Sequence, residues 1–363
     1  MANRRLFLEI GEEANRGAAE SSTIGGVPML NPGLPKMEFD DKFRADFRGE
    51  DPQLGPKSAQ RMSQKWAGSF EIPFYTESGG AANGLIGTII KHFFGDVTSA
   101  QNAATGQYYH MMYPVTDPFG TAALGSKALT MNINIHDGTT LELWPFVGGR
   151  VKSLSFDQEP GGQLKMSLEM FGQKLGTIGA GNSSPAEPAE NLRCDYNNLK
   201  VYTGTITRVG TAPNFTDFTF VSATQFSPDK ISVKIEDGKE DKLRLAGLDY
   251  PDKTRQGRFR VTLEMTIDFE DPASGFSSAD ELRAWLAAAS ATNFFLHWDT
   301  GAAAGTGDNH SLYIDLPAMQ RMGGEPEYSR DGDPTVTLKY EGLYSATTAY
   351  MIGVMLKNTA TAV

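Results

Sequence analysis

The stretch WAGSFEIPF at residues 66–74 decides the fold, because its apolar side chains recur at nearly every second position. The alternation returns in FRVTLEMTIDF at residues 259–269, where Trp66 corresponds to Phe259 when the two stretches are aligned. A period of two predicts a β-strand with one buried and one polar face. The recurrence indicates that one structural unit is written twice in this chain.

A second pair of strands supports the duplication. Residues 166–172 and 336–342 share the alternation, and both stretches end in glycine. In each half a short amphipathic helix follows the first strand, and an aromatic strand follows the helix, at residues 108–113 and 294–298. Since all strands alternate, chance similarity is the alternative, but the shared order of elements favours duplication.

The duplication predicts the organisation of the chain. We expect a mainly β fold of two tandem antiparallel β-sandwich or barrel modules, each with one short α-helix. The first module takes residues 1–178 with an extended N-terminal arm, a polar linker takes residues 179–190, and the second module takes residues 191–363. The first half is longer, and we expect its extra residues in loops around 95–106 and 117–127, because loops accept insertions cheaply.

Both expected helices show one apolar stripe. The stripe of the first helix, which ends at Gly95, comprises Ile86, Ile89, Ile90 and Phe93. The second helix begins with two possible capping boxes, Ser277 with Asp280 and Ser278 with Glu281. Its stripe, expected to be buried, comprises Leu282, Trp285, Leu286 and Ala289.

The N-terminal region looks poorly regular up to residue 64. Residues 6–10 can form a short strand, but frequent glycines and prolines follow. A run of mixed charges then covers residues 38–51, with phenylalanines between them. We therefore expect an extended arm or loop that docks on another surface.

Composition limits the function classes. The net charge of −11 argues against a tight nucleic-acid binder, which normally carries a basic patch. No apolar run is long enough to span a bilayer, and the N-terminus lacks the apolar core of a secretory signal, so we expect synthesis in a cytoplasm. The one cysteine, Cys194, excludes an internal disulfide, and the five histidines are scattered without metal-ligand spacing.

No catalytic constellation stands out. The carboxylate pairs Asp157 with Glu159 and Glu325 with Glu327 are the candidates for acid–base chemistry, but both lie beside turn residues and are expected to be solvated. The run at residues 331–333 resembles half of a calcium loop and lacks the later ligands. We therefore expect no enzyme activity, no catalytic residues, no cofactor and no metal site.

The order of the patterns is similar to that of tail tube proteins of tailed bacteriophages. The resemblance rests on WAGSFEIPF, GLIGTIIKHFFG and YYHMMYP in the first half, and on RVKSLSFDQEPGGQLKMSLEMFGQ at residues 150–173. The closing run SLYIDLPAMQRMGGEPEYSRDGDPTVTLKYEGLYSATT at residues 311–348 extends it, so that it covers residues 28–358. The N-terminal arm and residues 104–127 fit less closely.

The resemblance implies a structural virion protein. Members of the family form rings that stack into a hollow tube through which viral DNA passes. It implies contacts with the tape measure protein and with tail tip and terminator proteins, assembly in the host cytoplasm and no membrane. A two-module chain favours a trimeric ring with approximate sixfold symmetry, with a hexamer as the alternative.

Two surface features follow from this interpretation. Sheets of neighbouring subunits can join edge to edge, because free strand edges recruit other chains. The charged segments 40–65 and 237–258 are candidates for contacts between stacked rings, or are plain surface loops. Acidic residues on the bore would repel DNA phosphates, and Glu71 and Glu264 are the examples on the polar strand face.

Two rival functions remain. A tail terminator or a decoration protein would form a single ring or a surface layer without stacking. A carbohydrate-binding β-sandwich protein could stack sugars on exposed tryptophans, and the chain offers Trp66, Trp144, Trp285 and Trp298.

Overall fold

The structure is built almost entirely from antiparallel strands. The computed structural model describes residues 7–20, 24–31, 33–43, 59–76, 84–102, 106–115, 127–136, 139–181, 187–244, 248–327 and 333–363. Two α-helices occur within these residues. The prediction of a mainly β fold is confirmed.

The first half contains β1 (Phe7–Glu12), β2 (Ile24–Pro28), β3 (Lys36–Phe43), β4 (Ala59–Pro73), α1 (Leu85–Phe94), β5 (Thr98–Gln101), β6 (Tyr108–Met112), β7 (Leu129–His136), β8 (Leu141–Gln158), β9 (Lys165–Gly172), β10 (Lys174–Leu175) and β11 (Gly179–Ala180). Two short 3-10 helices follow, η1 (Glu190–Leu192) and η2 (Tyr196–Asn198). The second half contains β12 (Leu199–Thr211), β13 (Asn214–Phe226), β14 (Lys230–Glu236), β15 (Glu240–Lys242), β16 (Lys253–Arg255), β17 (Arg260–Asp268), α2 (Ser278–Ala287), β18 (Ala291–Gly305), β19 (Asp308–Gly323), β20 (Pro326–Glu327), β21 (Thr335–Gly342) and β22 (Gly353–Asn358).

The strand pairings of the first half recur in the second. The hairpin β1–β2 pairs with β7 through β1, as the hairpin β12–β13 pairs with β18 through β12. The hairpin β3–β4 continues into β9 and β8, as β14–β17 continues into β21 and β19. Each long hairpin, β7–β8 or β18–β19, follows the helix of its half. The topology is therefore duplicated.

Irregularities in the ladders mark the same positions in both halves. The register of β8 with β9 shifts between Val151 and Ser153, and that of β19 with β21 shifts between Arg321 and Gly323. A second matched pair of shifts lies in the hairpins β7–β8 and β18–β19. Because a bulge has a fixed place in a ladder, these shifts align the halves residue by residue.

This alignment corrects the expected equivalence of Trp66 and Phe259. Trp66 lies opposite Gly172, whereas Thr262 lies opposite Glu341, and a side chain at Gly342 would touch Val261. Trp66 therefore corresponds to Val261. The sequence pattern could not separate the two alignments, because a slip of an even number of residues keeps every side chain on its face.

The expected equivalence of the two aromatic strands is also wrong. The counterpart of β18 is β7, and the aromatic strand β6 instead pairs with the C-terminal β22 and with β5. The extra residues of the first half do lie between its helix and β7, but they include the hairpin β5–β6 as well as loop. Parts of this region, residues 103–105 and 116–126, lie outside the described residues.

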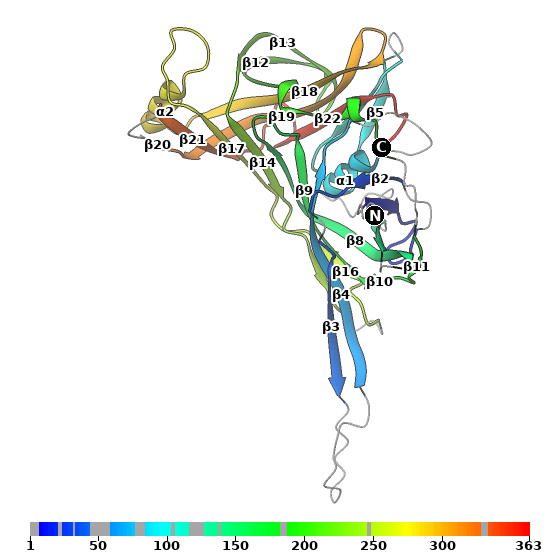
Figure 1. Cartoon of the computed structure of the whole chain (residues 1–363). Helices are drawn as coiled ribbons and strands as arrows, with labels where there is room; N and C mark the ends of the chain where they lie inside the picture. The colour runs from blue at the N-terminus through cyan, green and yellow to red at the C-terminus, as the bar shows by residue number, and fades with distance from the viewer. Residues whose placement is uncertain are drawn as a thin grey trace, which may run out of the picture.

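The N-terminal region is more regular than expected. It contributes β1, β2 and β3, each paired in an antiparallel ladder. The short strand predicted at residues 6–10 is confirmed from Phe7 onward as β1, and residue 6 lies outside the described residues. Glycine and proline in β2 are tolerated because this strand pairs only with β1 among the described strands. In Figure 1 the hairpin β3–β4 projects away from the rest of the molecule.

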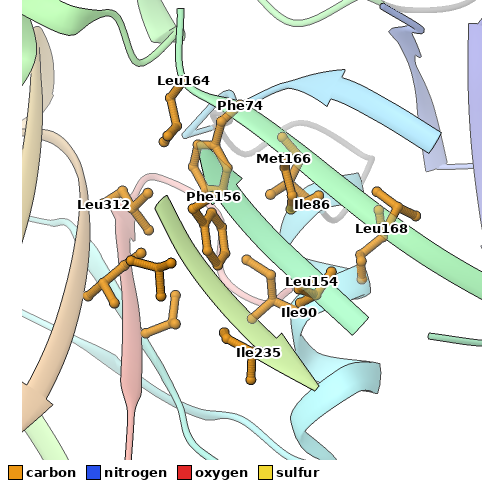
Figure 2. Packing of buried hydrophobic residues seen from close by; sticks show 14 of the residues in the cluster. Phe74, Ile86, Ile90, Leu154, Phe156, Leu164, Met166, Leu168, Ile235 and Leu312 are labelled. Atoms are coloured by element: carbon orange, nitrogen blue, oxygen red, sulfur yellow. The ribbon is translucent and has the colours of Figure 1, made fainter. Parts of the chain in front are cut away.

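One hydrophobic core extends through both halves. Figure 2 shows Phe74, Phe156 and Ile235 packed together with residues of α1 and β9. Helix α1 is buried along almost its whole length and ends at Gly95, whose positive φ of 104° closes the helix as predicted. Helix α2 differs, because Leu286 of its expected buried stripe is 72% exposed and the helix ends before Ala289.

The start of α2 is set by one of the two predicted capping residues. The Ser277 side chain accepts a hydrogen bond from the backbone N–H of Asp280 at 2.9 Å. The hydroxyl of Ser278 instead donates to the carbonyl of Asp268 at the end of β17 and accepts from the backbone N–H of Glu270. Ser277 is therefore the N-cap, and Ser278 anchors the helix to the sheet.

Candidate functional site: a polar sheet face and its free edges

A continuous sheet runs across the boundary between the two halves. Its strand order is β3–β4–β9–β8–β14–β17–β21, followed by β19 and β20. The joint is the antiparallel pairing of β8 with β14, in which Val233 lies opposite Phe156. In the order of strands across the sheet, β8 at the end of the first repeat therefore pairs with β14 at the start of the second repeat.

One face of this sheet is apolar and the other is polar. In β17, Val261, Leu263 and Met265 are buried, whereas Thr262 and Glu264 point to the opposite side. The same alternation holds in β9 and β14. The strand pleat therefore produces a polar face that crosses both halves.

Ion pairs cover the polar face. Glu71 pairs with Lys165 at 3.1 Å, and Glu264 pairs with Lys339 at 3.5 Å. Further pairs on or beside this face are Lys65–Glu38, Lys152–Glu169, Lys230–Glu159, Lys234–Glu236 and Arg260–Glu341. Glu71 and Glu264 thus lie on the polar face as predicted, but basic side chains balance the acidic ones there.

The two ends of the sheet are open edges. Among the described strands, β3 pairs only with β4, and β20 pairs only with β21. The last residues of β19 likewise pair on one side only, with β21. Strand edges of this kind present backbone N–H and C=O groups that can pair with another chain.

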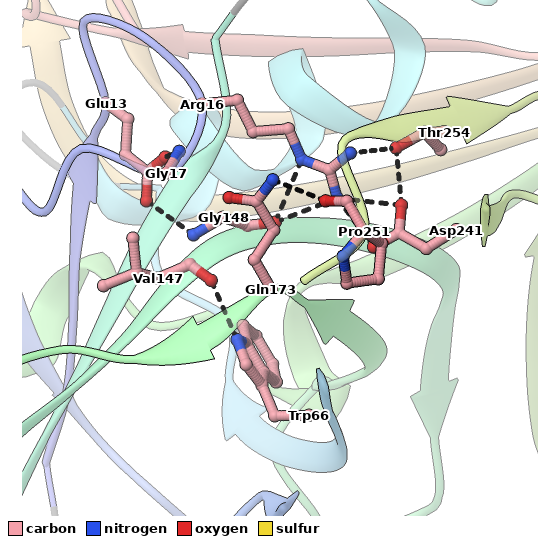
Figure 3. A network of polar contacts seen from close by, with 10 residues as sticks. All are labelled: Glu13, Arg16, Gly17, Trp66, Val147, Gly148, Gln173, Asp241, Pro251 and Thr254. Carbon is pink, nitrogen blue, oxygen red and sulfur yellow. Dashed lines mark hydrogen bonds and ion pairs between the residues drawn. The ribbon is translucent and has the colours of Figure 1, made fainter. Parts of the chain in front are cut away.

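A buried polar network joins the hairpin β15–β16 to the first half (Figure 3). Arg16 forms an ion pair with Asp241 at 2.7 Å and donates to Thr254 at 2.7 Å. Gln173 donates to the carbonyl of Pro251 at 2.6 Å. The side chains of Arg16 and Asp241 are only 9% and 7% exposed, so the network fixes the hairpin in place.

A second buried pair holds the start of the same segment. The ammonium of Lys239 lies beside the carboxylate of Asp237 and donates to the carbonyl of Phe93 at the end of α1. Burial raises the pKa of Asp237 and lowers the pKa of Lys239, while their mutual attraction opposes both shifts. The segment 237–258 is therefore anchored at both ends, and the described part of it is not a plain surface loop.

The carboxylates considered as catalytic candidates form hydrogen bonds or ion pairs within the sheet, or lie at its edge. Asp157 accepts hydrogen bonds from Ser155 at 2.7 Å and from Ser232 across the β8–β14 joint. Glu159 is exposed and pairs with Lys230. Glu325 and Glu327 lie at the open β20 edge, and residues 331 and 332 of the expected turn lie outside the described residues.

Other candidate residues belong to the core. Burial raises the pKa of the Cys194 thiol well above its usual value, which suits an inert buried side chain. Trp66 and Trp298 are 1% and 0% exposed and cannot stack on a sugar. Within the described residues no group of three His, Cys, Asp or Glu side chains is placed to hold a metal ion, and no described helix has the length and apolarity to cross a membrane.

Sequence reasoning missed the most informative features of this surface. Strand β3 was hidden in a charged run, although its residues 36–43 do alternate over Met37 and Phe39. The Arg16–Asp241 pair joins residues far apart in sequence, and no local pattern announces it. The open edges can be identified only when the pairing of the other strands is known.

Comparison with models of protein families identifies a match to this chain. A family model described as phage tail tube protein matches residues 49–342, which is most of the chain. Among curated proteins, none matches the chain.

Proposed function

The chain belongs to the phage tail tube protein family, and from this premise we propose that its copies join edge to edge into rings that stack around a DNA channel. It is a structural protein of the virion tail. We propose further that it assembles in the host cytoplasm and contacts the tape measure protein and the tail tip and terminator proteins.

The observation that carries the proposal is the joint between β8 and β14. There, one repeat already pairs laterally with the next inside a single chain. Because the topology is duplicated, the free β19–β20 edge of the second repeat is equivalent to the edge of β8 that pairs with β14. The free edge of β3 is equivalent to the edge of β14 that receives it. Copies of the chain can therefore continue the same sheet.

The two-repeat chain favours three copies in each ring. Each chain supplies two equivalent repeats, so three chains give approximate sixfold symmetry, and six single-repeat positions are filled. Six chains in a ring is the alternative. We propose that the chain divides into modules 1–178 and 191–363, with a linker at residues 179–190. The two modules share the hydrophobic core of Figure 2, so each module stabilises the other.

We propose that the polar sheet face lines the bore. Its lysines are engaged by carboxylates, as in Lys165–Glu71 and Lys339–Glu264, which leaves few basic groups for DNA phosphates. The projecting outer part of the hairpin β3–β4 and the anchored hairpin β15–β16, which lies between β14 and β17, occupy equivalent places in the two repeats. Both are suited to contacts between stacked rings.

Electron microscopy of the concentrated purified protein tests the proposal, with light scattering to determine the mass of the smallest ring. We expect tubes or rings with a central channel and a ring mass of three chains. Rings that never stack would favour a terminator, and a ring mass of six chains would favour the hexamer. A protein that stays monomeric at every concentration contradicts self-assembly.

A further inference from the structure

We infer that the internal β8–β14 joint is the template for the contact between protomers, and that it places Lys36 of one copy opposite Glu325 of the next. The inference rests on the proposed ring and adds the register and the side chains that select the partner. The partner is a second copy of this chain.

The template itself is well defined. Lys234 lies opposite Ser155, and Ile235 lies opposite Leu154. Ile235 and Leu154 are buried on the apolar face, whereas Lys234 is exposed on the polar face. The joint therefore combines a continuous apolar layer with polar contacts on the other side.

The positions of the β-bulges show which residues of the second repeat correspond to the β8 side of this joint. Since Ser153 corresponds to Gly323, Ser155 corresponds to Glu325 and the next residue, Phe156, corresponds to Pro326. Strand β20 keeps this correspondence, because Pro326 lies opposite Val336 as Phe156 lies opposite Met166.

The pairings within β3–β4 and β14–β17 show which residues of β3 correspond to the β14 side of the joint. Met37 lies opposite Trp66, and Ile235 lies opposite Val261. Because Trp66 and Val261 are equivalent, Met37 corresponds to Ile235, and the preceding Lys36 corresponds to Lys234. Lys36 of one copy then lies opposite Glu325 of its neighbour, as Lys234 lies opposite Ser155.

The chemistry of the two residues fits this placement. Lys36 and Glu325 are both exposed. The ammonium of Lys36 also attracts the carboxylate of Glu38, two residues along its own strand, but it stays exposed at the open edge where a neighbouring chain can reach it. Opposite charges that face each other across an antiparallel pair are favourable, and like charges there are unfavourable. The pair therefore favours the joining of β3 to β20 over the joining of two β3 strands or two β20 strands.

Prolines add to this selectivity. The same register places Pro35 of one copy opposite Pro326 of the next. Proline has no backbone N–H, so the ladder is interrupted at this position and neither edge is a good template for an arbitrary strand. Recognition between the edges then depends more on side chains than it does at the internal joint.

Charge reversal tests the ion pair. We expect Lys36→Glu or Glu325→Lys alone to reduce the assembled fraction several-fold at low salt, because each brings like charges together across the joint. The double variant K36E/E325K should recover assembly, since the pair is restored with its signs exchanged. Single variants that assemble like the wild type, or a double variant that stays impaired, would overturn the pairing.

Cysteine cross-linking tests the register directly. The native Cys194 is buried, so introduced cysteines are the accessible thiols among the described residues. Directly opposed residues in an antiparallel pair lie close enough for a disulfide, whereas the diagonal neighbours lie about 7–8 Å apart. Under oxidation, Lys36→Cys with Glu325→Cys should give covalent multimers on denaturing gels. The matched control, Lys36→Cys with Glu327→Cys, should give several-fold less.

The outcomes separate the two levels of the proposal. If the wild type forms no rings or tubes, the proposed function itself is contradicted. If the wild type assembles but the control variant cross-links as well as the K36C/E325C variant or better, the ring stands and the inferred register is wrong.

Discussion

At the residue scale, the two repeats are not interchangeable, and Gly172 illustrates why. A Cβ at Gly172 would lie 2.4 Å from the ring of Trp66, whereas a Cβ at the equivalent Gly342 would lie 3.0 Å from Val261. The indole of Trp66 cannot easily withdraw, because it is buried and donates to the carbonyl of Val147 at 2.9 Å. The aromatic residue in one repeat therefore requires glycine more strictly than the aliphatic residue in the other.

This contrast predicts unequal costs for the same substitution. Gly172→Ala should lower the free energy of unfolding by about 1–3 kcal/mol through overpacking against Trp66. Gly342→Ala is the matched control and should cost less, since its added Cβ would approach Val261 only to 3.0 Å. Urea denaturation of the unassembled proteins provides the measurement. Equal losses in the two variants would mean that the indole adapts to the added methyl group.

A partly buried histidine predicts acid sensitivity. His297 stacks on Tyr313 with 4.3 Å between ring centroids, and burial lowers its pKa to about 4. In the unfolded chain its pKa is close to 6.5, so unfolding takes up a proton between these values. Stability is therefore full above about pH 6.5 and falls as the pH drops toward 4, by up to about 3 kcal/mol for this group.

Replacement of the titrating ring tests this dependence. His297→Phe keeps an aromatic ring against Tyr313 and removes the proton uptake. We expect a smaller loss of stability between pH 7 and pH 4.5 than in the wild type, measured by denaturation at each pH. The buried histidines His92, His110 and His310 stay in both proteins, so the difference reports on His297 alone. An unchanged pH slope would contradict the assignment.

At the element scale, the hydrophobic pattern of the sequence predicted the buried strands. It failed for elements whose surroundings depend on which other segment pairs with them or covers them. The alternation at residues 259–269 predicted β17, because one face of this strand is buried. Strand β3 has exposed charges on an open edge, so its alternation is weak and it resembled a loop. Helix α2 has the apolar stripe of a buried helix, yet Leu286 is exposed, because a stripe does not say whether a covering surface belongs to the same chain.

The anchored hairpin β15–β16 gives a prediction at this scale. Asp241→Leu should destabilise the protein by about 3–5 kcal/mol, because it leaves the buried Arg16 guanidinium without its carboxylate. The double variant R16M/D241L should recover much of that loss, since no buried charge remains. Thermal unfolding compares the three proteins. Additive losses in the double variant would show that the two side chains act independently.

At the scale of the whole molecule, composition was a poor guide to the surface that matters. A net charge of −11 predicted an acidic bore, whereas the polar sheet face carries acids and bases in pairs such as Lys152–Glu169. Net charge is a sum over the chain and says nothing about which face carries it. The duplication was visible in the sequence, but the β8–β14 joint that makes one sheet of two repeats depends on pairing between distant strands.

The paired charges predict how DNA passes through the tube. Replacing Glu71, Glu169 and Glu264 by Gln frees Lys165, Lys152 and Lys339, which can then hold phosphates. We expect assembled tubes of this triple variant to retain double-stranded DNA at low salt and to release it as salt rises, with a log–log slope of about −3 for every chain that makes three phosphate contacts.

A second triple variant that breaks the same ion pairs with the opposite change in net charge isolates the effect. The triple variant with Gln at Lys165, Lys152 and Lys339 breaks the same ion pairs but leaves carboxylates, so it should retain no DNA. Both variants lose only exposed ion pairs, which contribute little to folding, so tube formation should persist in each. If the lysine-freeing variant stays as inert as the wild type, or if both variants retain DNA equally, the polar face does not meet the DNA and another surface lines the channel.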